Sequence, residues 1–181
     1  RGSHSREACI QYGTNDKSRA RDLAICAEKG FISADASKYW LWVYEKGDAE
    51  AFIKAATARL NTRGAAYDPQ SIITGFPKFF VERASDAQKD ALKALIRDLG
   101  FGGLDCASGQ DAFGFVKDPD VVGCLISAAG GDADAAPQAS KWWRNGDHGL
   151  IRNEAYADYL LDGLLQQPPG GSNGDGPKLA N

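Results

Sequence analysis

Apolar residues recur at intervals of three and four positions in several stretches of the chain, which is the spacing of one face of an α-helix. The clearest stretch follows Ser85, where Ser-Asp-Ala-Gln has the form of a capping box, and it ends at Gly100. Other stretches also follow a residue that can cap a helix: Asn15 or Asp16, Ser33 or Asp35, Asp48, Asp118 and Asn153. The pattern predicts a mainly α fold, a single compact irregular helical bundle.

An aromatic segment at positions 37–45 favours a helix, although its aromatic and β-branched residues also suit a strand. On a helix, one face would carry Tyr39 and Trp42 and another Trp40 and Tyr44, so one pair is expected in the core and the other partly exposed. Burial of both pairs is the alternative. Because exposed aromatic residues dominate contacts between proteins, we predict a set of binding residues: Trp40, Trp42, Tyr44, Trp142 and Trp143.

Glycine and proline mark the boundaries between the predicted helices. Pro77 is expected to interrupt a helix, which makes the stretch from Phe76 to Val81 a short apolar connector. Positions 101–109 are expected to form a glycine-rich loop, and positions 130–139 a loop of small and polar residues. Residues 168–181 are too poor in apolar groups to order themselves, so we expect a flexible tail there.

Length and composition fit one folded domain. The chain has 181 residues, of which 43% are hydrophobic and 25% charged, so a sizeable core can form and a wholly disordered chain is excluded. Methionine is absent even at position 1, which indicates a processed form or a fragment. We interpret residues 1–8 as a leader or the remnant of a tag, and we expect the helical domain to cover residues 9–167.

The charges and the apolar runs argue against two classes of partner. The 21 basic and 24 acidic residues give a net charge of -3 without a clustered basic block, so nucleic acid is not expected as a partner. No apolar run approaches the roughly 18 residues that cross a bilayer, so membrane insertion is not expected either.

Four cysteines occur as two local pairs, Cys9 with Cys26 and Cys106 with Cys124. An even number at matched short spacings is typical of disulfides, and each closed loop would contribute about 3 kcal/mol to stability. Four cysteines allow three connectivities, and four reduced cysteines in a cytosolic core are the alternative. The disulfide interpretation predicts an extracytoplasmic protein, secreted or periplasmic.

No metal site and no cofactor are expected. Cys-x-x-Cys is absent, and His148 is the only histidine beyond the N-terminal residues, which argues against zinc. The acidic residues Asp132 and Asp134, or Asp175, lack the twelve-residue pattern of a calcium loop. The glycine strings also lack the spacing of a phosphate-binding loop.

Two segments of the chain could carry cysteine chemistry. Cys106 lies in Gly-Leu-Asp-Cys-Ala-Ser, and His148 lies in Asn-Gly-Asp-His-Gly-Leu-Ile. The first segment resembles the cysteine motif of the NlpC/P60 peptidoglycan amidases, and the second is similar to their histidine strand. The resemblance implies a hydrolase in which Cys106 is the nucleophile, His148 is the base and Asp147 orients the base. The alternative is that Cys106 is bonded to Cys124 and that His148 is a turn residue.

Paired carboxylates are a second route to an enzyme, because a glycosidase needs two acids at a suitable separation. The candidate acids lie near turns or helix starts, where they could line a cleft with the tryptophan pair at positions 142–143: Asp105, Asp111, Asp147 and Glu154. Acids at such places also act as helix caps, which is the alternative.

These patterns favour a binding protein over an enzyme. Small helical periplasmic immunity proteins that neutralise cell-wall amidases are similar in kind, with a cysteine in the first helix and a tryptophan in the second. We therefore predict a secreted or periplasmic module that binds another protein, as an inhibitor, immunity factor or accessory subunit does, without catalysis of its own. The alternative is a cell-wall hydrolase that uses Cys106 and His148.

Overall fold

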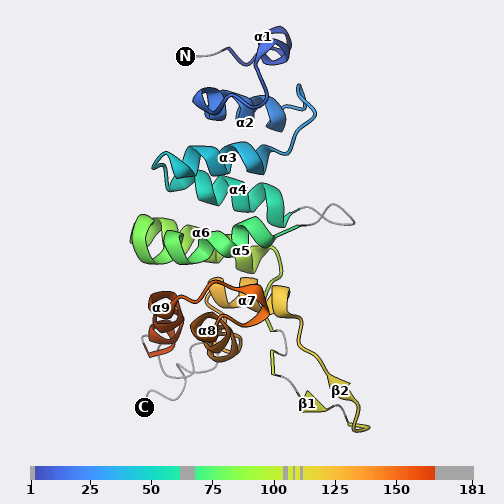
Figure 1. Ribbon diagram of the computed structural model, residues 1–181, viewed down its shortest axis with the longest axis vertical. Helices are drawn as coiled ribbons and strands as arrows, with labels where there is room; N and C mark the ends of the chain where they lie inside the picture. Colours follow the sequence, from blue (N-terminus) through green and yellow to red (C-terminus); the bar gives the residue numbers. More distant parts are fainter. Residues whose placement is uncertain (1–2, 62–67, 104–105, 108, 111, 166–181) are drawn as a thin grey trace, which may run out of the picture. The chain divides into compact units, whose positions relative to one another are not determined.

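The computed structural model describes residues 3–61, 68–103, 106–107, 109–110 and 112–165, which are mainly α-helical (Figure 1). The helices are α1 (Arg6–Gln11), α2 (Ala20–Glu28), α3 (Ala36–Glu45), α4 (Glu50–Leu60), α5 (Gln70–Lys78), α6 (Asp86–Asp98), α7 (Val121–Ala129), α8 (Ala136–Asn145) and α9 (Glu154–Leu165). Short elements join them: the 3-10 turns η1 (Lys17–Arg19) and η4 (Asp147–Gly149), and the antiparallel strands β1 (Gly109–Gln110) and β2 (Val116–Lys117). The predicted fold class, mainly α with two local disulfides, is confirmed.

The chain divides into two compact units. Unit 1 comprises Arg1–Ile72 with Arg83–Gln88, and unit 2 comprises Ile73–Glu82 with Lys89–Asn181. The domain predicted over residues 9–167 stays a prediction, and the tail predicted at 168–181 lies outside the described residues. Part of the predicted leader is ordered: Ser5 caps α1, and the His4 ring lies 2.8 Å from a carboxylate oxygen of Asp22 in α2.

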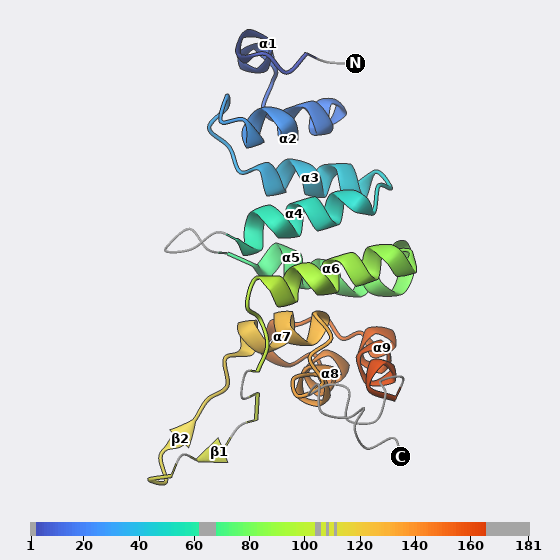
Figure 2. The same cartoon turned by 180° about the vertical axis from the view of Figure 1, so that it is seen from behind.

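Unit 1 is built from short helices in which α2 packs on α3 and α3 packs on α4 (Figures 1 and 2). Aspartates fix where these helices begin, because the carboxylate of Asp16 accepts the Ser18 N–H before α2, and that of Asp35 accepts the Ser37 N–H at the start of α3. The helix predicted over the aromatic segment is therefore confirmed as α3. The Cys9–Cys26 disulfide joins α1 to α2.

The Arg59 guanidinium of α4 holds the starts of two helices in unit 1. It forms an ion pair with Asp35, donates to Ser37 Oγ at 2.9 Å and to the Asp68 carbonyl at 2.8 Å, and lies 3.3 Å from Ser71 Oγ. Burial alone would raise the pKa of Asp35, but the hydrogen bonds from Ser37 and the charge of Arg59 outweigh burial and hold this pKa below its ordinary value. One side chain thus ties α4 to the beginnings of α3 and α5.

Replacement of this guanidinium should destabilise unit 1. We expect Arg59→Met to lower the free energy of unfolding by about 2 kcal/mol, because the side chain is only 15% exposed and several acceptors lose their donor. Urea denaturation followed by circular dichroism measures the change, and Arg83→Met, at an exposed position, is the control with an expected change below about 0.5 kcal/mol. Equal losses in the two variants would contradict the prediction.

The same interaction gives stability that depends on pH. Because the folded-state pKa of Asp35 is below the ordinary value of 3.8, its contribution is present above that pH and is lost as the pH falls through the folded-state pKa. The Arg59→Met variant should therefore lose less stability in acid than the wild type.

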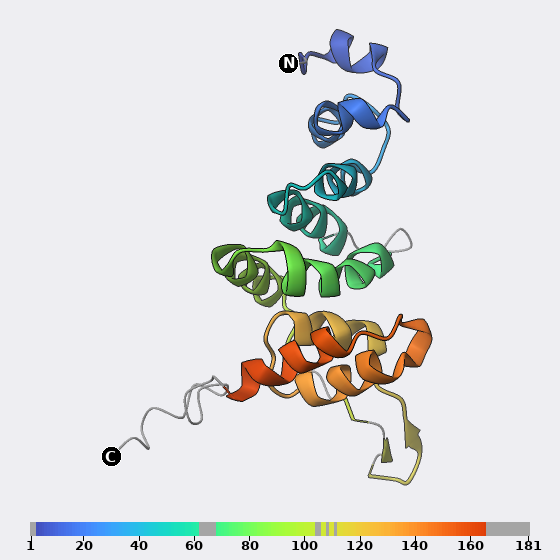
Figure 3. The same cartoon turned by 60° about the vertical axis from the view of Figure 1, so that its left-hand side comes forward.

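Unit 2 packs α7 against α8 and α8 against α9 (Figure 3). Its core holds an aromatic cluster made of Phe80, Trp143, Tyr156 and Tyr159. The Tyr156 ring is central, with ring centroids 5.3 Å from Trp143 and 6.1 Å from both Phe80 and Tyr159. The Tyr156 side chain is fully buried, which raises the pKa of its hydroxyl well above 10.

The connector predicted from Phe76 to Val81 is wrong. Pro77 lies inside α5, and the backbone continues into a π-helical turn, η3 (Phe79–Arg83). The rings of Phe76, Phe79 and Phe80 are at most 1% exposed. Burial of three aromatic side chains therefore outweighs the one backbone hydrogen bond that proline cannot donate.

At two further helix starts, one sequence prediction is confirmed and the other is wrong in its bounds. The capping box is confirmed, because Ser85 Oγ accepts the Gln88 N–H at 3.2 Å and Gln88 Oε1 accepts the Ser85 N–H at 2.9 Å. The loop predicted at 130–139 is too long, since α8 already begins at Ala136 with Pro137 in its first turn. Proline fits there because the first turn of a helix needs no N–H donor.

Candidate functional site

Most of the predicted binding residues lie in the core. The exposed fractions are 3% for Trp40, 6% for Tyr44, 5% for Trp142 and 2% for Trp143, whereas Trp42 is half-buried. The reason on α3 is that the helix contacts both α2 and α4, so that both of its aromatic faces meet a neighbour. Of the four aromatic residues on α3, Trp42 alone is therefore partly exposed.

Trp40 has its interactions within unit 1. Its indole N–H donates to Glu28 Oε2 at 2.9 Å, and the Arg21 and Lys54 cations lie 5.8 and 5.1 Å from its ring centroid. Both Glu28 and Lys54 also line an open pocket of about 580 Å³ with Ala36, Thr57, Ala58 and Asn61. The satisfied indole indicates that Trp40 is a structural residue of this packing.

Trp42 carries two lysines on its ring. The ammonium groups of Lys17 and Lys38 lie 5.3 and 5.1 Å from the ring centroid, and the buried Tyr39 packs edge-on at 5.2 Å. The Lys46 ammonium donates to the Lys17 carbonyl. We call the four residues Lys17, Lys38, Trp42 and Lys46 the lysine–tryptophan surface.

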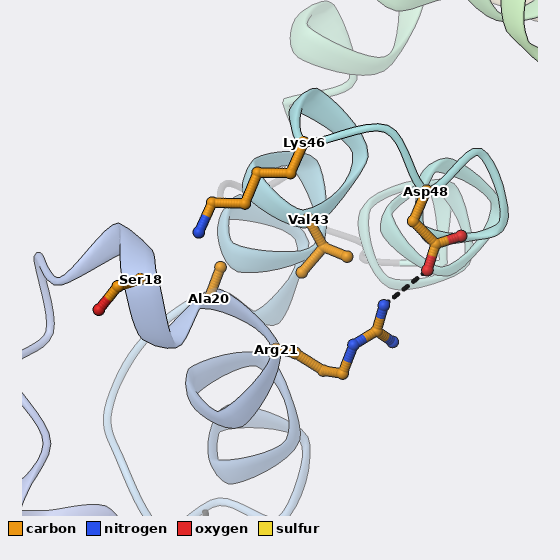
Figure 4. A pocket seen from close by; sticks show the side chains of 6 residues that line it. All are labelled: Ser18, Ala20, Arg21, Val43, Lys46 and Asp48. Carbon is orange, nitrogen blue, oxygen red and sulfur yellow. Dashed lines mark hydrogen bonds and ion pairs between the residues drawn. The ribbon is translucent and has the colours of Figure 1, made fainter. Parts of the chain in front are cut away.

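An open pocket of about 290 Å³ adjoins this surface in unit 1 (Figure 4). The buried side chains of Ala20 and Val43 form its apolar part. Lys46 points its ammonium toward the side of the pocket that Ser18 and Ala20 line (Figure 4). On the other side, Arg21 forms an ion pair with Asp48 at 2.6 Å. The hydrogen bond from Arg21 lowers the pKa of Asp48, so this carboxylate stays ionised.

A β-hairpin projects from the helices of unit 2 (Figures 1 and 3). Its strands β1 and β2 pair Gly109 with Lys117 and Gln110 with Val116. Strands of two residues are too short to be stable alone. The Cys106–Cys124 disulfide joins the segment that precedes the hairpin to α7, and Cys124 is fully buried.

The end of this hairpin exposes two phenylalanines. Phe113 is 85% exposed and Phe115 is 70% exposed, with Gly114 between them at a φ of 86°. We call residues 113–115 the hairpin tip. Burial of a phenylalanine side chain is worth about 1.5–3 kcal/mol, so two rings this exposed on one loop offer apolar surface that a partner could bury.

No protein family matches this chain, and no curated protein or solved structure matches it significantly. Sequence reasoning missed the hairpin tip, because a search for helical spacing passes over a short loop. The available signal was Phe-Gly-Phe between the paired cysteines 106 and 124, because two large apolar residues separated by one glycine do not follow helical spacing.

The residues predicted for cysteine chemistry belong to different segments of unit 2. Cys106 is bonded to Cys124, so its sulfur is not a thiol in this oxidised form. His148 is exposed in η4 at a φ of 57°, and its ring packs edge-on against Trp142 with centroids 4.8 Å apart. Asp147 is half-buried in the same turn. A dyad of Cys106 and His148 would first require reduction of the disulfide, and it stays a prediction.

The predicted carboxylate pair is only partly described. Asp105 and Asp111 lie outside the described residues, and Glu154 lies 3.8 Å from Arg152 at the surface. Within the described ranges, no three His, Cys, Asp or Glu side chains gather as a metal site would require. None of the helices described here combines the length and apolar character needed to cross a membrane.

Proposed function

We propose that the protein is an extracytoplasmic binding module that holds another protein through the hairpin tip, as an inhibitor, immunity factor or accessory subunit does, without catalysis of its own. The observation that carries this proposal is the exposure of Phe113 and Phe115 on a loop joined by a disulfide to α7. Aromatic residues are enriched at the centres of protein interfaces, where a few anchors supply most of the binding energy.

Segments on both sides of the hairpin are held by contacts within unit 2, which lowers the entropic cost of binding. Besides the disulfide, the Asp132 carboxylate accepts the Gly103 N–H at 3.0 Å and the Ser127 hydroxyl at 2.7 Å. Asp120 caps α7 directly after the hairpin by accepting the Gly123 N–H. A loop that is already held in place loses less freedom when its partner binds.

The charged residues next to the tip in the sequence favour a protein partner over an anionic membrane. Asp111, Asp118 and Asp120 flank the two phenylalanines, against the single basic residue Lys117. Anionic lipid attracts segments rich in lysine and arginine and repels an acidic one. The matching partner surface is an apolar pocket with a basic rim, which would hold both rings and attract the neighbouring carboxylates.

The disulfides support the proposed compartment. Both bridges are formed, and all four cysteine side chains are at most 4% exposed. Such bridges persist in oxidising environments, which include the periplasm and the extracellular space. Bonded sulfur at Cys106 also supports a role that does not depend on a reactive thiol.

The test places a photo-crosslinking residue, p-benzoylphenylalanine, at position 113 of the full chain and, as a control, at Ile151, which is 82% exposed. Irradiation in extracytoplasmic extract of the source organism should join one protein to position 113 but not to position 151. That protein is then purified, and its affinity for the wild type and for the variant Phe113→Ser/Phe115→Ser is measured by calorimetry. We expect the variant to bind at least about 100-fold more weakly, because two anchors are lost.

A matched control separates lost anchors from lost folding. Ile151→Ser/Leu165→Ser removes two side chains that are as exposed as those of the tip, and it should bind as the wild type does. Both double variants should keep the thermal midpoint of the wild type, since none of the four side chains is buried. A change in affinity below threefold for the tip variant, or flotation of the wild type with phosphatidylglycerol vesicles in place of a protein crosslink, would overturn the proposal.

A further inference from the structure

The lysine–tryptophan surface gathers three positive charges around one indole ring. Lys38 and Trp42 lie four residues apart on α3, and Lys46, the C-cap of this helix, follows Trp42 by four more residues. Lys17 joins them from η1. None of these three lysines forms an ion pair with a residue that the structure describes. Like charges held around one indole ring raise the local potential, which favours an anionic partner.

The pocket in Figure 4 adds an apolar floor and an oriented cation to this surface. Lys46 lines the pocket and also donates to the Lys17 carbonyl, so its ammonium belongs to both features. The other cation of the pocket, Arg21, already has Asp48 as its partner. The ammonium of Lys46 has a neutral carbonyl as its acceptor, which leaves its charge available to a ligand.

We propose that the lysine–tryptophan surface of unit 1 binds an acidic segment of a protein, with one carboxylate of that segment seated in the pocket beside Lys46. A glutamate side chain suits this pocket, because its methylenes can contact Ala20 and Val43 while its carboxylate meets the ammonium. Further acidic residues of the segment would lie along Lys17 and Lys38, with Trp42 as the apolar contact between them. The inference goes beyond the hairpin tip and does not depend on it.

The neighbouring acids argue for a protein segment and against a nucleic acid. Asp16 lies beside the surface, and its pKa is lowered first by the hydrogen bonds from Ser18 and also by the charge of Lys46. Asp48 lies at the pocket and Glu45 is exposed on α3. Continuous phosphates would meet these carboxyl groups, whereas a peptide can place its few acidic side chains between them.

The test uses a fluorescein-labelled decaglutamate peptide as the probe and the full chain as the receptor, followed by fluorescence anisotropy. We expect saturable binding at about 50 mM salt that weakens strongly at about 300 mM. The variant Lys17→Gln/Lys38→Gln/Lys46→Gln should bind at least tenfold more weakly than the wild type. The charge-matched control Lys29→Gln/Lys54→Gln/Lys141→Gln, which removes three exposed lysines elsewhere, should weaken binding less than threefold.

Two further measurements make the outcome decisive. The variant Phe113→Ser/Phe115→Ser should bind the peptide as the wild type does, so that failure at the hairpin tip and failure at this surface are told apart. A ten-nucleotide oligothymidylate with the same label should bind more weakly than the peptide. Equal losses in the two lysine variants, no saturable binding of the peptide, or tighter binding of the oligonucleotide would each overturn the inference.

Discussion

Reduction of both disulfides should lower the total free energy of unfolding by about 6 kcal/mol, which is comparable with the whole stability of many domains. Each unit holds one bridge, and the bridges join residues 17 and 18 positions apart. Closure of a loop of this length removes unfolded-chain entropy worth about 3 kcal/mol. Urea denaturation with and without a phosphine reductant, followed by circular dichroism, measures the difference.

Variants assign the loss to each bridge. Cys9→Ser/Cys26→Ser should lose about 3 kcal/mol in unit 1 and Cys106→Ser/Cys124→Ser about the same in unit 2. With all four cysteines replaced, the reductant should have no further effect. If wild-type protein kept its urea midpoint after complete reduction, verified by mass, the entropic argument would be wrong.

Two substitutions at Tyr156 should have opposite effects on stability. Its hydroxyl is buried and has no hydrogen-bond partner among the described residues, and a buried polar group without a partner costs about 1–3 kcal/mol. Tyr156→Phe removes only this group and should raise the free energy of unfolding by about 1 kcal/mol. Tyr156→Ala removes the ring from the aromatic cluster and should lower it by about 3–5 kcal/mol. Thermal and urea unfolding measure both.

The stability of the wild type and of Tyr156→Phe at alkaline pH gives a second, independent test of the buried hydroxyl. Since burial raises the folded-state pKa of Tyr156 well above 10, the wild type should be fully stabilised below pH 10 and lose stability as the pH rises toward that pKa. Tyr156→Phe should lose less over the same range. A loss of more than 1 kcal/mol in Tyr156→Phe at neutral pH would show that the hydroxyl has a stabilising interaction.

Much of the fold could be predicted from local sequence signals. Asp35, Ser85 and Asn153 cap helices where the sequence indicates, because capping depends on a short side chain and the next few N–H groups. The disulfide pairing was also predictable from spacing, because chain loops of this length close readily. The failure at Pro77 has a nonlocal cause, since burial of the neighbouring rings decides the backbone there.

The candidate site was less predictable than the fold. Aromatic content does not distinguish a core residue from an exposed one, so Trp40 and Trp143 were predicted as binding residues although they are buried. Their exposure depends on which helices pack on both sides, and this is settled by tertiary structure. The hairpin tip is recognised only from the structure, which leaves Phe113 85% and Phe115 70% exposed.

The covalent loop between Cys106 and Cys124 has a consequence for how the protein survives digestion. Exposed loop tips are preferred sites of proteolysis. Phe113 and Phe115 are exposed there, and phenylalanine is a residue next to which many proteases cleave. A cut at either position leaves the two fragments linked through sulfur. The clipped molecule would run as a single band without reductant and as two bands with it, and its helices would stay joined.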